Sequence, residues 1–231
     1  MRVRVATTAV GITAVALLAL PACSSRTDTA RPAPSSSTRP GSPAAMEQNS
    51  TPLSSATLTA RLLNKGDLAS GYTRKPMRPA QHDDVAVLGC PALSDLGGDA
   101  ATRGSLDFPR QAKISFTYAG RGGSEVSEEL YSDTPDKLSD GMARIFEAMT
   151  GCPEYQVLVG GSAVDIATQK TAPPHLGDEQ WSQMLTFSAD GHDSVVKQTA
   201  VRDGNVLVVV SGSPALVDRH LDKAVAKAAR R

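Results

Sequence analysis

Aromatic residues and an excess of charge of either sign are what this 231-residue sequence lacks most. Phe, Trp and Tyr together contribute 4% of the residues, and 24 Lys and Arg stand against 24 Asp and Glu. Nucleic-acid binding needs a basic surface, and unpaired bases need aromatic rings to stack on. The composition therefore argues against a nucleic-acid partner, and the core must be built mainly from Val, Leu, Ile and Ala.

Common catalytic and metal-binding motifs are missing as well. The segment Gly161-Ser162-Ala163 lacks the second glycine of a hydrolase nucleophile elbow, and His82-Asp83-Asp84 is typical of a solvated loop. We therefore expect no catalytic residue, no cofactor and no metal site. The four histidines are scattered, with no His-x-x-x-His spacing, and we expect the last to be a partly exposed surface residue: His82, His175, His192 and His220.

The N-terminus has the three parts of an export leader. Arg2 and Arg4 precede an apolar run, Val5 to Leu20, which is shorter than the roughly 20 apolar residues of a membrane span. The next residues, Leu20-Pro21-Ala22-Cys23, resemble the lipobox of a bacterial lipoprotein signal peptide, although Pro21 replaces the usual small or β-branched residue. An uncleaved anchor and an ordinary secretory leader are the alternatives.

The lipobox resemblance implies that residues 1–22 are removed and that Cys23 carries acyl chains. Two acyl chains anchor a protein stably, whereas one binds only marginally, and a diacylglyceryl group on Cys23 would supply two. The mature chain would then lie on the extracytoplasmic face of the cell membrane. Loss of Arg2 and Arg4 leaves 22 basic against 24 acidic side chains, a net charge of −2.

Composition divides the rest of the chain into two parts. Residues 23–52 are rich in Ser, Thr, Pro and Ala, with almost no large apolar side chains. Such a segment buries too little surface to fold, so we predict a disordered tether with a reach of about 30 Å. Residues 53–231 have the length and apolar content of one folded domain.

Cysteine usage predicts one disulfide. With Cys23 lipidated, Cys90 and Cys152 are the only internal pair left, and thiols pair by default in an oxidising compartment. Closing the loop between them gives roughly 4 kcal/mol by the chain-entropy model. A redox-active pair is the alternative, but neither cysteine has the Cys-x-x-Cys context that lowers the pKa of a thiol.

Residue patterns predict an α+β domain, in which helices pack on a mainly antiparallel sheet that ends in a β-meander. Val206 to Val210 is apolar at every position, which predicts a central strand covered on both faces. We expect Thr134 to cap a helix that ends before Gly151. The expected helices lie around Leu58 and Leu62 and over 91–96, 135–150 and 214–231. The expected strands cover 112–119, 124–132, 155–159, 163–169, 180–188, 193–202 and 205–211, and residues 73–88 and 97–111 are expected to be loops.

Short motifs in the same order resemble the PknH-like extracellular sensor domain found behind some mycobacterial receptor kinases and in actinobacterial lipoproteins. The resemblance covers residues 53–231 and implies an extracellular domain with a groove, a ligand-sensing or partner-binding role and no catalytic residues. The sequence differs from that family in one respect, since the kinase domain carries two disulfides and this chain has cysteines for only one. The matching residues are Leu62-Leu63, Asp67-Leu68, Gly71-Tyr72, Cys90-Pro91-Ala92-Leu93, Cys152-Pro153, Leu176-Gly177-Asp178-Glu179 and Arg202 to Val210.

One segment combines features of a binding site. Gly177-Asp178-Glu179-Gln180-Trp181 holds the single Trp beside two carboxylates. Asp178, Glu179 and Trp181 could form the rim of a cleft, with the ring stacking on a cationic or hydroxylated ligand that the carboxylates select. The alternative is a turn followed by a strand whose Trp packs into the core.

The sequence therefore predicts a non-enzymatic, membrane-anchored lipoprotein whose sensor-like domain binds an envelope ligand or a protein partner. An envelope hydrolase or transferase is one alternative, which Glu128 or Glu129 facing Asp178 in a deep cleft would favour. A lipid carrier is the other, and it would need a large apolar cavity.

Overall fold

The computed structural model describes residues 51–76, 85–97, 100, 108–120 and 123–230. They belong to one compact unit. The predictions for the leader, for Cys23 and for most of the tether lie outside the described residues, as does most of the loop expected over 97–111.

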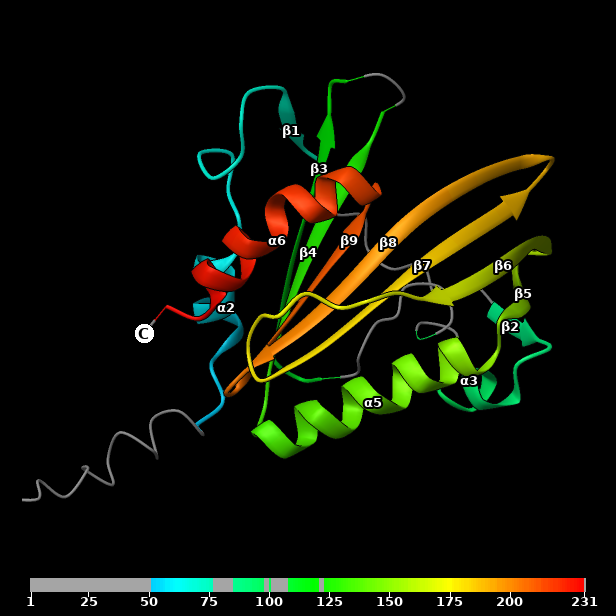
Figure 1. Cartoon of the computed structure of the whole chain (residues 1–231), viewed down its shortest axis with the longest axis horizontal. Coiled ribbons are helices and arrows are strands. Elements are labelled where there is room, and N and C mark those ends of the chain that lie inside the picture. Colours follow the sequence, from blue (N-terminus) through cyan, green and yellow to red (C-terminus); the bar gives the residue numbers. More distant parts are fainter. Residues whose placement is uncertain (1–50, 77–84, 98–99, 101–107, 121–122, 231) are drawn as a thin grey trace, which may run out of the picture. The chain divides into compact units, whose positions relative to one another are not determined.

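The described elements are nine strands and four helices (Figure 1). The strands are β1 (Tyr72–Arg74), β2 (Val85–Leu88), β3 (Gln111–Tyr118), β4 (Glu125–Ser132), β5 (Glu154–Val159), β6 (Ser162–Lys170), β7 (Glu179–Ala189), β8 (His192–Asp203) and β9 (Val206–Gly212). The helices are α2 (Ser55–Arg61), α3 (Pro91–Asp95), α5 (Pro135–Gly151) and α6 (Pro214–Ala228). This confirms the predicted α+β class.

All nine strands join one antiparallel sheet in the order β1-β3-β4-β9-β8-β7-β6-β5-β2. Strands β5 to β9 pair with their sequence neighbours and form the predicted meander. The turns between them contain the glycines that the sequence marks, such as Gly161 and Gly191, both with positive φ. Strand β9 is flanked by β4 and β8 and lies well inside the sheet, as its apolar sequence predicts.

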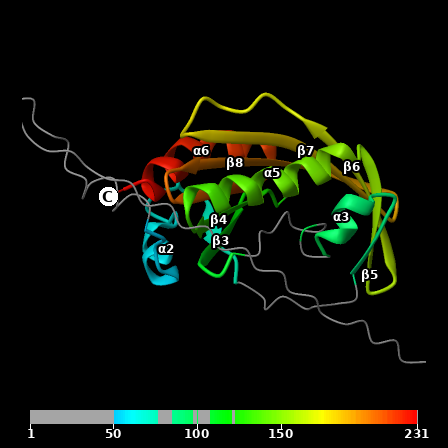
Figure 2. The same cartoon turned by 90° about the horizontal axis from the view of Figure 1, so that it is seen from below.

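The sheet separates two cores, which we name by their faces. Face 1 carries Val206, Val208 and Val210 and is covered by α2 and α6. Face 2 carries Leu207 and Val209 and is covered by α3 and α5. Figure 2 shows α5 and α6 on either side of β8. Every residue of the run Val206 to Val210 is buried, because alternate side chains enter different cores.

The helices bury the stripes that the sequence predicts. On α5 the buried residues include Leu138, Met142, Ile145, Phe146 and Met149. The helix continues through Gly151, one residue beyond the predicted end, and Cys152 is its C-cap. Thr134 is at the N-cap position as expected, but its side chain accepts no capping hydrogen bond. Its backbone N–H instead donates to Asp133 Oδ1.

The predicted loop over residues 73–88 was partly wrong. Two short strands, β1 and β2, occupy its ends and form the two edges of the sheet. Short edge strands carry little pattern: β2 pairs only with β5, and its burial alternates over four residues. Residues 77–84 lie outside the described residues.

The expectation of an exposed His220 was also wrong. The side chain is buried, and Nε2 lies 2.6 Å from Tyr72 Oη. The two rings meet edge to face. Burial, followed by the positive charges of Arg219 and Lys223, lowers the pKa of His220. This contact joins α6 to edge strand β1, a tertiary pairing across 148 positions that sequence periodicity does not reveal.

The described helices include none that is both long and apolar enough to cross a membrane.

Candidate functional site

The predicted disulfide is present between Cys90 and Cys152. Cys90 is the N-cap of α3, and Cys152 is the C-cap of α5. Both helices cover face 2, so the bond joins the two helices over the half of the sheet that contains β5 and β2. It is a structural element of that core, and the redox alternative has no support from its buried surroundings.

The predicted site residues Asp178 and Glu179 converge on the guanidinium of Arg202. Arg202 Nη1 donates to Asp178 Oδ2 at 3.0 Å, and Nε donates to Glu179 Oε2 at 2.7 Å. Ser139 of α5 donates to the other Glu179 oxygen. We call these four residues the Arg202 corner. The hydrogen bond from Arg202, aided by that from Ser139, lowers the pKa of Glu179 despite partial burial.

The backbone approaches closely at the Arg202 corner. Gly177 has φ +64°, and a Cβ there would lie 2.4 Å from the carbonyl oxygen of Arg202. The Asp178 N–H donates to that same oxygen, and the Gly204 N–H donates to Asp178 Oδ2. The glycine and both carboxylates thus fasten the loop before β7 to the end of β8, which is a structural task.

Trp181 packs under α5. Its ring stacks on Phe146 with centroids 5.5 Å apart, and Lys170 Nζ lies 4.0 Å from the ring centroid. The indole N–H is buried without a hydrogen-bond partner among the described residues. Trp181 is two residues from Glu179 on the same face of β7, but its ring faces the core. The alternative interpretation of a packed Trp therefore describes its position.

The carboxylates that would favour a hydrolase lie apart. Glu128 and Glu129 are neighbours on β4, so their side chains enter opposite faces of the sheet. Glu128 accepts a hydrogen bond from the Leu63 N–H, and Glu129 accepts from Lys113 and Tyr131. Asp178 belongs to the Arg202 corner. The described residues also contain no group of three or more His, Cys, Asp or Glu placed to hold a metal ion.

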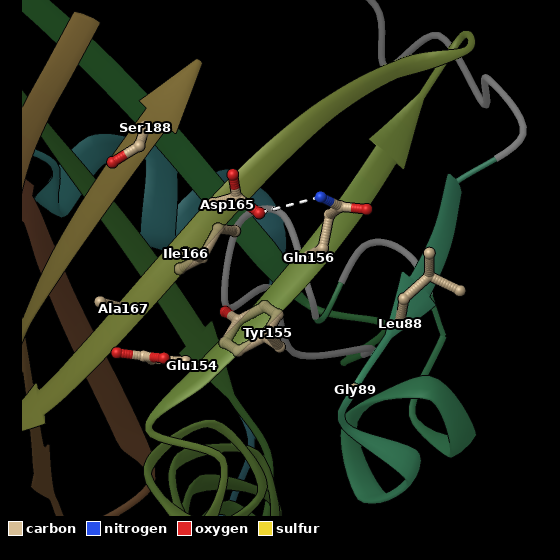
Figure 3. Close-up of a pocket in the computed structure, with 9 residues that line it drawn as sticks. All are labelled: Leu88, Gly89, Glu154, Tyr155, Gln156, Asp165, Ile166, Ala167 and Ser188. Carbon is tan, nitrogen blue, oxygen red and sulfur yellow. Dashed lines mark hydrogen bonds between the residues drawn. The ribbon is translucent and has the colours of Figure 1, made fainter. Parts of the chain in front are cut away.

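A surface that the sequence patterns did not indicate lies on the part of face 1 that none of the described helices covers. Helix α6 packs on β9, β8 and β4, and in Figure 1 it lies away from β6, β5 and β2. There the structure has a pocket of about 550 Å³. Its lining consists of Leu88, Gly89, Glu154, Tyr155, Gln156, Asp165, Ile166, Ala167 and Ser188 (Figure 3).

Strand register explains why these residues meet. Gln156 pairs with Leu88 on one side and with Asp165 on the other, and Asp165 pairs with Ser188. Paired residues share a face of the sheet, so a row of side chains crosses four strands. Tyr155 and Ile166 also line the pocket, but their side chains belong to the core on face 2. We call the face 1 members, Leu88, Glu154, Gln156, Asp165, Ala167 and Ser188, the open patch.

The open patch is acidic and partly apolar. Asp165 accepts a hydrogen bond from Gln156 Nε2 at 2.9 Å, which Figure 3 shows as a dashed line. Glu154 forms no ion pair with any described residue, and no Lys or Arg is among the described residues that line the pocket. Among the described residues the exposed large hydrophobics are Leu88 and Val195, both 47% exposed. Val195 pairs with Thr186 on β7, on this same face.

The fold is similar to that of a solved extracellular domain. The extracellular domain of PknH from Mycobacterium tuberculosis superposes with a TM-score of 0.55 at 15% sequence identity, over 77% of this chain and 95% of that one. A putative uncharacterized protein from Mycobacterium smegmatis, the Rv0999 ortholog, covers 75% of this chain and 94% of its own at 13% identity, with a TM-score of 0.39. No family model and no curated protein matches the sequence.

The chain shares the fold of the PknH extracellular domain, as its motif order predicted. At 15% identity the likeness extends to the fold and not to individual site residues. Any statement about binding must therefore rest on the residues of this chain.

Proposed function

We propose that this chain is a lipid-anchored extracytoplasmic binding protein without enzymatic activity, and that the open patch receives a small cationic ligand such as an amine. The observation that carries the ligand assignment is the charge of the pocket. Glu154 and Asp165 line it, and the described lining residues include no basic side chain. Carboxylates attract a cation over distances set by ionic strength and donate nothing to an anion.

The apolar part of the patch supports a ligand with a hydrocarbon portion. Leu88 is half exposed, and Ala167, which pairs with Glu154, adds a methyl group on the same face two strands away. The volume of about 550 Å³ is within the range of small-molecule sites, 300–1,000 Å³. Gln156 and Ser188 add hydrogen-bonding groups at the same row of the sheet.

Extracytoplasmic placement is supported by two independent features, the lipobox-like segment ending in Cys23 and the disulfide between Cys90 and Cys152. Disulfides persist in oxidising compartments. A fold shared with an extracellular domain agrees with them. Contact of a ligand with Asp178, Glu179 and Trp181 stays a prediction, and their present partners are Arg202, Ser139 and Phe146.

A titration followed by NMR tests the ligand assignment. Spermidine is added to the ¹⁵N-labelled chain from Ser24 to Arg231, and we expect amide shifts to cluster on β5 and β6. The double substitution Glu154→Gln with Asp165→Asn should weaken binding at least tenfold. Asp140→Asn with Glu147→Gln, which also removes two exposed carboxylates but from α5 on the other face, is the matched control and should bind like the wild type.

Equal weakening by the control double substitution on α5 would mean that spermidine responds only to net charge, and the ligand assignment would fail. Shifts confined to residues 178–181 would move the site to the Arg202 corner. If spermidine does not bind while a protein of the envelope cross-links at the open patch, the occupant is a protein partner instead.

The anchor has its own test. Cys23→Ala should move the protein from the detergent-extractable membrane fraction to the medium, because the acyl chains have no other attachment point in the proposal. Retention of the Cys23→Ala variant in the membrane fraction would disprove lipid anchoring and leave the ligand assignment unaffected.

A further inference from the structure

Glu128 is a buried carboxyl group that the proposed binding function does not use. It lies in the middle of β4, opposite Ile114 of β3 and Val210 of β9, and its side chain enters the core on face 1. The residue is 1% exposed. Isolated carboxylates are rarely placed in such an apolar position, because removing their charge from water is costly.

Only half of this carboxyl group is satisfied. Oε2 accepts a hydrogen bond of 2.6 Å from the backbone N–H of Leu63, two residues after the end of α2. Oε1 is buried and has no hydrogen-bond partner among the described residues. A carboxylate in this place would keep a full charge with one oxygen unsolvated, whereas a neutral carboxyl loses much less on burial.

The charged groups that face Glu128 come from the turn after α2 and from α6. Asp67 lies in that turn and pairs with Lys227 at 2.5 Å and with Lys223 at 3.8 Å. The flanking residues on β3 and β9 are apolar. Burial raises the pKa of Glu128 to about 7, and Asp67 adds to this, while the Leu63 N–H and Lys227 act in the opposite direction.

Helix α2 and the residues that follow it pack against the domain close to Glu128. Leu58, Leu62 and Leu63 are buried in the face 1 core, and Arg61 Nη1 donates to the carbonyl oxygen of Ala228 at the end of α6. The chain immediately before α2 is fixed as well, because the Leu53 N–H donates to Ser132 Oγ. The segment 53–67 is therefore the junction between the folded domain and the residues that precede it.

We propose that Glu128 acts as a proton-dependent latch, in which the neutral carboxyl holds α2 and the following turn against β4 and α6, and loss of the proton loosens this junction. The ionised form would draw water toward Oε1 and repel Asp67. Both changes act on the segment 53–67 and not on α5, which lies on the other face. The latch would make the attachment of the domain to its preceding chain sensitive to external pH.

The direction of the pH effect follows from linkage. The pKa of Glu128 in the fold is raised, from 4.5 to about 7. Its stabilising contribution is therefore present below about 4.5 and is lost as pH rises through about 7. The shift corresponds to at most roughly 300-fold in the opening equilibrium. His220 on α6 has a lowered pKa and acts in the opposite sense, since its contribution is lost on acidification.

NMR of the chain from Ser24 to Arg231 tests the latch between pH 5 and 8. We expect the amide shift of Leu63 to titrate with a midpoint near 7. Exchange protection at Leu62 and Leu63, corrected for the intrinsic pH dependence of exchange, should fall at least tenfold, while Leu138 of α5 stays protected. Glu128→Gln should abolish both effects. Glu125→Gln, which removes an exposed carboxylate from the same strand, should leave them unchanged.

A Leu63 shift that does not change with pH would overturn the proposal. So would a titrating shift with constant protection of α2, which would make Glu128 a buried acid without a mechanical role. If Glu128→Gln does not fold, Asp67→Asn decides instead. Removing the facing negative charge should lower the midpoint of the Leu63 titration, and an unchanged midpoint would contradict the latch.

Discussion

The two halves of face 1 place acidic residues in opposite environments. Under α2 and α6, Glu128 is buried among aliphatic side chains, and its pKa is raised by burial to about 7. On the open patch, Glu154 and Asp165 lie on the same face of the same sheet but are exposed to solvent. The sheet contributes similar strands to both halves. Whether a helix covers the strand decides whether its carboxylate serves as a buried acid or as a surface charge.

The covered half also explains why the open half exists. Helix α6 has 15 residues; it packs mainly on β4, β9 and β8, and His220 also contacts Tyr72 of β1. On face 2, α5 packs on β9, β8, β7 and β6, so its contacts are shifted toward β6 relative to those of α6. The two helix layers are therefore offset, and each face has an end that no described helix covers. On face 1 that end is the open patch.

Truncation of an apolar side chain should give the largest difference in the free energy of unfolding between the two halves of face 1. Leu130→Ala removes a fully buried side chain from the covered half, and we expect it to lower the free energy of unfolding by about 2–5 kcal/mol. Leu88→Ala, from the open patch, should change it by less than about 0.5 kcal/mol. Urea unfolding followed by circular dichroism measures both. A loss of more than about 2 kcal/mol for Leu88→Ala would show that the open patch is covered in solution.

The disulfide should have the next largest effect, on the open half. Strand β2 lies at the edge, beside β5, and the bond between Cys90 and Cys152 joins the helices beneath them. Replacing both cysteines with Ser should lower the free energy of unfolding by about 2–4 kcal/mol. Dithiothreitol should destabilise the wild type to the same extent and leave the double variant unchanged. An effect of the reductant on the variant would point to a cause other than this bond.

Sequence patterns predicted those elements whose burial repeats with a clear period. The stripe of α5, the terminal helix and the apolar run of β9 are long enough for the period to be evident. Strands β1 and β2 have three and four residues, so alternation cannot distinguish them from a loop. The disulfide followed from counting cysteines, which needs no structural information.

The sites were harder to predict than the fold because they depend on partners distant in sequence. Asp178 and Glu179 were recognised as unusual, but Arg202, 23 positions from Glu179, was not identified as their partner. The open patch requires the register of four strands, and the burial of Glu128 requires two helices to close over β4. Local sequence patterns indicate the periodic burial of a single helix or strand. They do not indicate which residues of distant elements become partners, because cross-strand pairing is set by tertiary structure.

The smallest expected effect concerns the Arg202 corner. The Asp178 side chain is 54% exposed, so its ion pair with Arg202 is screened by solvent. We expect Asp178→Asn to lower the free energy of unfolding by less than about 1 kcal/mol, the usual range for such pairs. Glu179→Gln should cost more, because Glu179 is less exposed and also accepts from Ser139. Urea unfolding of each single variant and of the double variant gives their coupling. If Asp178→Asn instead leaves stability unchanged and abolishes binding of an envelope ligand, the Arg202 corner and not the open patch is the binding site.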